Sequence, residues 1–245
     1  MAAAAVKALA RQLGWDKVGI TTPDGFHLPD WARTVVVLGL ATLDEAWDYQ
    51  LHVAYQGKRV WSKWAYERLT ALAGRLALRL VQAGLQAEPL TYEDSYALID
   101  LKVAAVRAGL GVRGQNNLVV SREFGPRIRF GAVFTSAPLS LDAALRDYYC
   151  TNCTICWGAC PDRALGPTGL DRSRCRAEFD PTPEMARRQE REAKRLSPGA
   201  RLQCIRCITS CPIGKRAGRR GTWRSPQTRR GGRGPHVRRR HRPRR

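Results

Sequence analysis

The feature that most constrains this chain is a set of eight cysteines, all of which lie within residues 150–211 of a 245-residue sequence. The stretch YYCTNCTICWGACPDRAL, residues 148–165, carries the first four at Cys150, Cys153, Cys156 and Cys160. Their spacing, C-x₂-C-x₂-C-x₃-C-P, is that of bacterial ferredoxins, in which the fourth cysteine ligates the other cluster of a two-cluster protein. Two-residue spacings curl the backbone around one cubane, so three thiolates reach three irons.

A second cysteine group follows in LQCIRCITSCPIGK, residues 202–215. It is one cysteine short of the ferredoxin run, and the isolated Cys175 can supply the missing thiol. The interleaved pattern predicts two 4Fe-4S clusters that use every cysteine of the chain. The first cluster takes Cys150, Cys153, Cys156 and Cys211, and the second takes Cys160, Cys175, Cys204 and Cys207.

Two other uses of clustered cysteines remain open. Two C-x₂-C pairs can hold one zinc ion, which closes its shell with four ligands, and eight thiols could form four disulfides in an exported protein. The N-terminus, however, has no long apolar core followed by a cleavage site. Val6, Leu9 and Leu13 recur there at helical spacing, which favours an amphipathic helix over a signal peptide. A cytoplasmic protein is therefore expected.

The composition, with 44% hydrophobic and 26% charged residues, is that of a globular protein. No apolar run reaches the roughly 18 residues that a membrane span needs. The net charge of +21 is concentrated at one end, because residues 213–245 carry +14 and residues 1–212 carry +7. The Arg-, Gly- and Pro-rich segment 216–245 cannot bury an apolar core, so it is predicted to be a disordered basic tail.

The first 145 residues predict an α+β domain. The β-branched run TVVVLGLA, residues 34–41, is typical of a strand buried on both faces, and leucines at helical spacing indicate a long helix over 61–84. Between the cysteine groups, Thr182 and Pro183 suit the start of an exposed helix in which Glu190 precedes Lys194 by one turn. Further helices are expected over 2–14 and 97–109, and further strands over 17–22, 87–92, 117–121 and 128–136, the last two as a pair.

A glycine-rich stretch, AAVRAGLGVRGQNNLVVSREFGPRIRFGAVFTSAPL, occupies residues 104–139. Its glycines allow the backbone to approach a ligand closely or to adopt positive φ. The letters G-L-G-V-R-G fit a dinucleotide-binding fingerprint, but they follow a predicted helix instead of a strand, which argues against that site.

The order ARTVVVLGLA, then the glycine-rich stretch, then the interleaved cysteines resembles the epoxyqueuosine reductases and the related cobalamin-dependent reductive dehalogenases. The likeness covers residues 8–215. It implies an N-terminal α/β cobalamin-binding-type domain over 1–145, a ferredoxin-like two-cluster domain over 146–215, and the disordered tail over 216–245. Epoxyqueuosine reductases continue past the clusters into a helical-repeat domain that helps to grip tRNA, and we expect this chain to lack that domain.

The resemblance also implies a chemistry. Cobalamin is held in a base-off state, the clusters reduce its cobalt to nucleophilic Co(I), and an acidic group delivers a proton to the substrate. In epoxyqueuosine reductases that substrate is a modified tRNA base, which loses its epoxide oxygen. The candidate cofactor contacts in this chain are Gly109, Gly111, Gly114, Asn116, Asn117, Gly125 and Arg127. An Asn pair after Gly can equally form a turn, and Arg127 can equally face solvent.

The acid of the family lies upstream of the glycine-rich stretch, in a D-[ST]-x-P-like context. Here YEDSYALID, residues 92–100, offers Asp94 and Asp100 as catalytic candidates, but the proline is absent. Asp94 is the better match to the family motif. The structural alternative for either residue is a helix N-cap or a surface charge.

Three functions are consistent with these features. The first is a cobalamin-dependent iron–sulfur reductase that receives electrons from an external donor such as a flavodoxin or ferredoxin. The second is a ferredoxin-like electron carrier without substrate chemistry of its own. The third is an RNA-binding protein with structural clusters, whose basic tail neutralises tRNA phosphates and stacks Trp223 on a base. The size of the first domain and its glycine-rich stretch favour the reductase.

Overall fold

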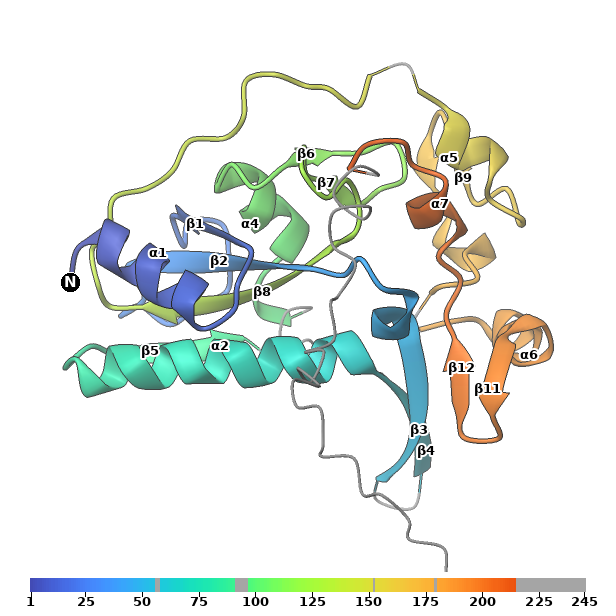
Figure 1. Cartoon of the computed structure of the whole chain (residues 1–245), viewed down its shortest axis with the longest axis horizontal. Coiled ribbons are helices and arrows are strands. Elements are labelled where there is room, and N and C mark those ends of the chain that lie inside the picture. Colours follow the sequence, from blue (N-terminus) through green and yellow to red (C-terminus); the bar gives the residue numbers. More distant parts are fainter. Residues whose placement is uncertain (56–57, 91–96, 152, 179, 215–245) are drawn as a thin grey trace, which may run out of the picture.

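The computed structural model describes residues 1–55, 58–90, 97–151, 153–178 and 180–214 (Figure 1). Its centre is a four-stranded antiparallel sheet with the strand order β1-β2-β8-β5. The strands are β1 (Lys17–Thr21), β2 (Thr34–Ala41), β8 (Ile128–Thr135) and β5 (Ala87–Leu90). All four were predicted from the sequence, and β2 is buried along nearly its whole length, as its apolar run indicated.

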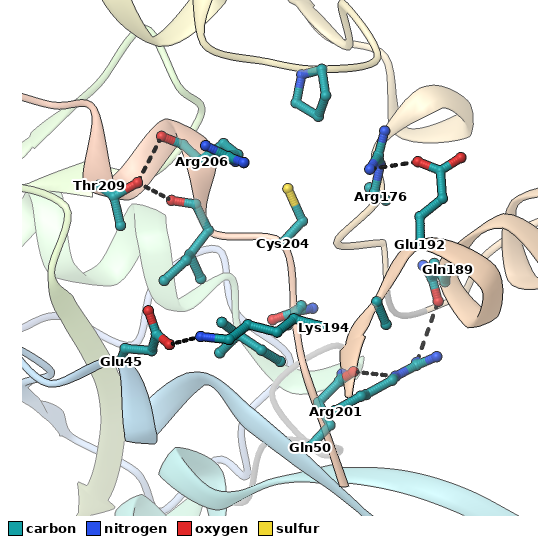
Figure 2. A pocket seen from close by; sticks show the side chains of 15 residues that line it. Glu45, Gln50, Arg176, Gln189, Glu192, Lys194, Arg201, Cys204, Arg206 and Thr209 are labelled. Carbon is teal, nitrogen blue, oxygen red and sulfur yellow. Dashed lines mark hydrogen bonds and ion pairs between the residues drawn. The ribbon is translucent and has the colours of Figure 1, made fainter. Parts of the chain in front are cut away.

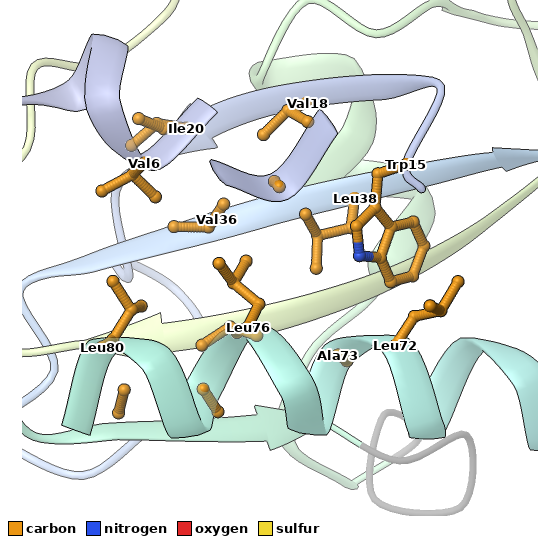
Figure 3. Packing of buried hydrophobic residues seen from close by; sticks show 14 of the residues in the cluster. Val6, Trp15, Val18, Ile20, Val36, Leu38, Leu72, Ala73, Leu76 and Leu80 are labelled. Carbon is orange, nitrogen blue, oxygen red and sulfur yellow. The ribbon is translucent and has the colours of Figure 1, made fainter. Parts of the chain in front are cut away.

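Helices cover both faces of this sheet, which gives a mixed α and β architecture with two hydrophobic cores. On one face lie α1 (Ala3–Gln12) and α2 (Trp64–Gln82), and on the other lies α4 (Leu101–Arg107) (Figure 1). Because successive side chains of a strand point to opposite faces, β2 contributes to both cores. Val36 and Leu38 pack with α1 and α2 (Figure 3), whereas Val35 and Val37 pack with α4.

The glycine-rich stretch folds as a hairpin beside the sheet. Its strands β6 (Val112–Arg113) and β7 (Val119–Val120) pair with each other, and β8 pairs with β2 and β5. The predicted pairing of 117–121 with 128–136 is therefore wrong. Gly111 accounts for the difference, because a Cβ there would lie 2.4 Å from the Val120 carbonyl oxygen, so only a glycine lets β6 approach β7 this closely.

A second antiparallel sheet was not predicted. Its order is β11-β12-β3-β4, and Ala200 of β12 stands opposite Leu51 of β3. The strands are β3 (Tyr49–Tyr55), β4 (Lys58–Lys63), β11 (Lys194–Ser197) and β12 (Ala200–Leu202), and η1 (Glu45–Asp48) leads into β3. This sheet therefore takes strands from both sides of the domain boundary expected at residue 145.

The helix expected between the cysteine groups is α6 (Pro183–Glu192). The Thr182 hydroxyl accepts a hydrogen bond from the Met185 backbone N–H at 3.3 Å, and Pro183 occupies the first turn, so the predicted cap is confirmed. The predicted pairing of Glu190 with Lys194 is wrong, because the helix ends before Lys194. Lys194 instead lies 2.8 Å from Glu45, while Glu190 accepts from Arg201 at 2.5 Å.

The remaining elements are short and surround the cysteines. They are α5 (Ile155–Gly158), β9 (Leu165–Gly166), β10 (Gly169–Leu170), η2 (Arg172–Arg174) and α7 (Arg206–Thr209). Among the described residues, no helix combines the length and the apolar character needed to cross a bilayer. The predicted basic tail 216–245 lies outside the described residues.

Candidate metal centres

Two short helices bring the cysteine motifs together although they are far apart in the sequence. Cys156 lies in α5 and Cys207 lies in α7, and the two helices pack against each other (Figure 1). Cys160 follows α5 and Cys204 precedes α7. Neither helix exceeds four residues, so the cysteines sit on tight turns of the chain.

The thiols expected for the first cluster influence one another's ionisation. Burial raises the pKa of Cys156 to about 11, with Cys150 as the next cause and Cys153 and Cys211 as smaller ones. Burial also raises the pKa of Cys211, and Cys150 and Cys153 act in the same direction. Cys156 and Cys211 thus each lie in the electrostatic range of both Cys150 and Cys153. Cys150, Cys156 and Cys211 are buried, and Cys153 is exposed.

The thiols expected for the second cluster form a neighbouring group. Burial raises the pKa of Cys207 to about 12, and Cys204 and Cys175 are the next causes. Burial raises the pKa values of Cys175 and Cys204 as well, and Cys160 adds to both. All four are half-buried. Cys156 of the first expected group acts on Cys207 more strongly than Cys160 does, so the two expected groups adjoin each other and are not separated by these shifts.

A cubane places a different requirement on the thiols than a single metal ion does. In the described part of the chain, no three His, Cys, Asp or Glu side chains converge closely enough to hold a single metal ion. A 4Fe-4S cluster offers a separate iron to each thiolate, so it needs four thiols around a shared volume and not four at one point. All eight cysteines are free thiols.

The glycine-rich hairpin holds the beginning of the first cysteine motif. The Gln115 backbone N–H points at the Cys150 sulfur at 3.5 Å, and the indole N–H of Trp157 donates to the Gln115 carbonyl at 3.1 Å. The Tyr148 hydroxyl donates to the Arg113 carbonyl at 2.5 Å, and the Tyr149 hydroxyl donates to the Val120 carbonyl at 2.6 Å. An amide directed at a thiolate stabilises its negative charge, which is how a protein tunes a cluster.

Several residues expected to contact a cofactor serve the local packing of this hairpin. Asn117 has φ of 61° and its side-chain oxygen accepts from Arg113, while the Asn116 side-chain oxygen accepts from the Leu118 N–H at 3.1 Å. These contacts are those of a turn. Close backbone neighbours explain why glycine occupies positions 109 and 111. A Cβ would lie 2.5 Å from a carbonyl oxygen at Gly109 and 2.4 Å from another at Gly111. A Cβ at Gly114 would lie 2.5 Å from a Val120 methyl group.

Arg127 and Gly125 contact the end of the second cysteine motif. The Arg127 guanidinium donates to the carbonyl oxygens of Cys211 and Ile213 at 2.7 and 2.8 Å. A Cβ on Gly125 would lie 2.0 Å from the Ile213 carbonyl oxygen. Arg127 therefore does not simply face solvent, and in this structure its donors are directed to the cysteine loop.

The structure describes one of the two candidate acids, Asp100. Asp94 lies outside the described residues. The Asp100 carboxylate caps α4, because one oxygen accepts from the backbone N–H groups of Lys102 and Val103 at 2.8 and 3.1 Å. This is the N-cap role weighed in the sequence analysis, and it leaves Asp100 exposed at the start of the helix.

A pocket of about 360 Å³ opens beside Cys204 (Figure 2). Its wall is a mixture of charged and polar side chains, which include Glu45, Gln50, Arg176, Glu192, Lys194, Arg201 and Arg206. Sequence reasoning missed this site because its members come from distant segments. Arg201 donates to Gln50 at 2.8 Å although the two are 151 residues apart in the sequence.

Comparison with known proteins gives a consistent picture. No protein-family model matches the chain. The chain is 33% identical over 150 residues to the epoxyqueuosine reductase of Pseudomonas aeruginosa, which covers 61% of this chain and 38% of that protein. It is 31% identical over 192 residues to the epoxyqueuosine reductase of Lactococcus garvieae, covering 75% of this chain and 52% of that protein. The chain thus spans about half, or less, of the length of these relatives.

Solved structures agree in fold. An epoxyqueuosine reductase with an epoxyqueuosine-modified tRNA-Tyr stem loop superposes with a TM-score of 0.62 at 20% identity, covering 86% of this chain and 65% of that one. A reductive dehalogenase whose structure suggests a mechanism for B12-dependent dehalogenation gives a TM-score of 0.65 at 20% identity, covering 88% of this chain and 33% of that one. The chain is an epoxyqueuosine reductase-like protein, related in sequence and fold to the reductive dehalogenases.

Proposed function

We propose that this chain is an iron–sulfur reductase that passes electrons from two 4Fe-4S clusters to a corrinoid, which reduces an organic substrate. The observation that carries the proposal is that α5 and α7 pack against each other and bring the two cysteine motifs together, while the Gln115 amide attaches Cys150 to the glycine-rich hairpin of the first domain. A two-cluster carrier needs no such attachment, whereas a reductase must deliver electrons into the domain that holds its substrate.

The residues have distinct roles in this proposal. Cys150, Cys153, Cys156 and Cys211 hold the first cluster, and Cys160, Cys175, Cys204 and Cys207 hold the second. The amides of Gln115 and Ala164 direct their N–H groups at the sulfurs of Cys150 and Cys160, at 3.5 and 3.2 Å, and would donate hydrogen bonds to the sulfurs of a bound cluster. Burial of three of the first four thiols keeps water from that centre, which tunes its potential.

The corrinoid is the part of the proposal supported by relatives more than by geometry. A bound corrinoid would supply a strongly reducing cobalt centre to the substrate. The expected contacts at Gly109, Gly111, Gly114, Asn116 and Asn117 make local packing interactions in this structure, and Arg127 bonds the cysteine loop. These residues therefore do not form a corrinoid cradle by themselves. Asp94 is proposed as the proton donor, with Asp100 as the alternative.

The proposed substrate is a modified nucleoside of tRNA, because a structural neighbour binds a tRNA stem loop. The Arg-rich segment 216–245 is proposed to add phosphate contacts. Affinity for tRNA should be measured with and without residues 216–245 over a salt series. Truncation should weaken binding and flatten the salt slope, and equal affinity with an unchanged slope would reject the contribution of the segment.

One experiment tests the whole proposal. The protein is purified without oxygen, its clusters are reconstituted, cobalamin is added, and the visible spectrum is recorded during chemical reduction. Tight binding of base-off cobalamin and reduction of its cobalt through the clusters are the expected result. Two intact clusters without cobalamin binding would overturn the reductase.

Two intact clusters without cobalamin binding would support a ferredoxin-like electron carrier without substrate chemistry. One observation favours this alternative: Gly109, Asn116 and Asn117, which were expected to contact a cofactor, make packing and turn interactions within the chain instead. In either case an external electron donor such as a flavodoxin or ferredoxin is required. The pocket beside Cys204 is the proposed point of approach, because it brings solvent close to a thiol of the second cluster.

A further inference from the structure

A single side chain from the first domain holds the loop that carries the last cysteine. Arg127 lies in the turn EFGPR immediately before β8, and Cys211 is 84 residues further along the chain. The Nη2 atom of Arg127 donates to the Cys211 carbonyl at 2.7 Å and its Nη1 atom donates to the Ile213 carbonyl at 2.8 Å. The planar guanidinium therefore spans two peptide groups, a geometry that an ammonium group cannot reproduce.

The backbones of the two loops also touch. Gly125 and Gly214 both adopt positive φ, 60° and 76°, and a Cβ on Gly214 would lie 2.2 Å from the Phe124 carbonyl carbon. The Gly125 loop is closed by reciprocal backbone hydrogen bonds with Ser121, at 2.8 and 2.9 Å. Arg127 therefore projects from a constrained turn against which the Cys211 loop is already pressed.

The same stretch of chain also holds the other end of the first cysteine group. The Gln115 N–H reaches the Cys150 sulfur, twelve residues before Arg127 in the sequence. Cys150 and Cys211 are separated by sixty-one positions, and the segment 115–127 contacts both. The segment therefore holds in place both residues that are expected to be the two most remote ligands of the first cluster.

Charge adds to this geometry. The guanidinium of Arg127 carries a positive charge, and its hydrogen bonds to the Cys211 and Ile213 carbonyls hold that charge beside the residue that bears the thiol.

We propose that Arg127 is a positioning residue of the first cluster, which fixes the Cys211 loop and raises the reduction potential of that cluster alone. The inference rests on the proposed function, because it requires that Cys211 ligate iron. Reduction adds a negative charge to the cluster, so a nearby fixed cation favours the reduced form. The hydrogen bonds to the two carbonyls keep that cation in place.

The test uses the full chain with reconstituted clusters. Arg127→Gln removes the charge, Arg127→Lys keeps the charge but loses the two-carbonyl fork, and Arg79→Gln on the exposed face of α2 is the matched control. A redox titration followed by EPR measures the reduction potential of each cluster. The EPR signal that is lost in Cys211→Ser is assigned to the first cluster. For Arg127→Gln we expect the ratio of reduced to oxidised first cluster at fixed potential to fall about tenfold, equivalent to ~59 mV for one electron. Arg127→Lys should give a smaller shift, and the second cluster and the control should not change.

A second readout needs no metal. In the cluster-free chain, hydrogen exchange at the amides of Ile213 and Gly214 should be faster in both Arg127 variants than in Arg79→Gln, because the loop loses its anchor. If Arg127→Gln does not fold, Arg127→Lys alone decides by the same two measurements. An unchanged first-cluster potential, or an equal shift of both clusters, would overturn the inference while the proposed function stands. A wild-type chain that assembles no cluster would overturn both.

Discussion

Asp48 and Arg129 form a buried ion pair, with 2.6 Å between the carboxylate Oδ1 and the guanidinium Nη2 and only 4% and 12% of their side chains exposed. Lys63 approaches the same carboxylate at 3.6 Å and is equally buried. Burial acts to lower the pKa of Arg129, but the charge and hydrogen bond of Asp48, together with contributions from Tyr66 and Cys207, outweigh it, so the pKa is raised. One carboxylate therefore compensates two cations at the junction of the two sheets.

Asp48→Asn should be strongly destabilising, because it leaves Arg129 and Lys63 buried without a counter-charge. We expect the free energy of unfolding to fall by about 3–5 kcal/mol, as when one partner of a buried pair is removed. Asp44→Asn is the control, since Asp44 is exposed and caps η1, and asparagine caps a helix equally well. Equal losses in urea unfolding would contradict the role of Asp48.

Cys175→Ser and Cys211→Ser should each remove one cluster. Two cubanes contain roughly eight irons and eight sulfides per chain, so each variant should retain about half of both. Anaerobic metal and sulfide analysis, together with EPR, measures the loss. If Cys175→Ser leaves both centres intact, the interleaved assignment is wrong, and stoichiometric zinc in place of iron would support the zinc alternative.

Gly214→Ala should weaken the contact between the two loops. The new Cβ would meet the Phe124 backbone at 2.2 Å, and alanine is strained at a φ of 76°. We expect a loss of about 1–3 kcal/mol in the free energy of unfolding. Gly199→Ala is a matched control, because a Cβ there has no neighbour within 4 Å, and its effect should stay within about 0.5 kcal/mol. Similar losses in both variants would show that the contact is unimportant.

The ion pair between Lys17 and Glu123 should contribute to stability only above acidic pH. Burial acts to raise the pKa of Glu123, but the hydrogen bond from Lys17 at 2.8 Å, a backbone hydrogen bond, the charge of Lys17 and the Ser121 hydroxyl together outweigh it, so the pKa in the folded protein is lowered. A lowered folded pKa means that the stabilisation is present above the unfolded pKa and is lost as the pH falls through the folded one. Glu123→Gln should thus cost up to about 1 kcal/mol at pH 7, since the carboxylate is more than half exposed.

The corresponding measurement is urea unfolding of both proteins at neutral pH and again below the folded pKa of Glu123. The difference between wild type and Glu123→Gln should shrink at the lower pH. A difference that does not depend on pH would mean that the side chain acts through packing and not through its charge.

Local patterns in the sequence predicted the elements of the first sheet. The β-branched run of β2 and the leucine spacing of α2 identify elements whose burial is set by periodicity within one segment. Thr182 and Pro183 marked the start of α6 for the same reason, because a helix cap is a local interaction. The spacing of the cysteines likewise predicts which thiols share a cluster, and that assignment stays a prediction.

Contacts between remote segments could not be predicted in the same way. Strand β12 pairs with β3 across about 150 residues of sequence, and nothing in ARL or YQLHVAY specifies that partner. Arg127 and Arg129 occupy alternate positions of one segment, and the sequence gives no sign that they bind different parts of the chain. Their separate partners, the Cys211 loop and Asp48, become visible only when the two halves of the chain are brought together.

The 49–63 hairpin and the 194–202 hairpin share one sheet, which limits where the chain can be divided or recombined. A chain cut at residue 145 would leave the edge of β3 with unsatisfied amides and carbonyls along Tyr49, Gln50 and Leu51. The cysteine-bearing half therefore cannot be exchanged on its own between related proteins. A chimeric protein that takes the cysteine-bearing half from one parent should therefore take the 49–63 hairpin from the same parent. Otherwise β3 and β12 would come from different sequences at the place where they pair.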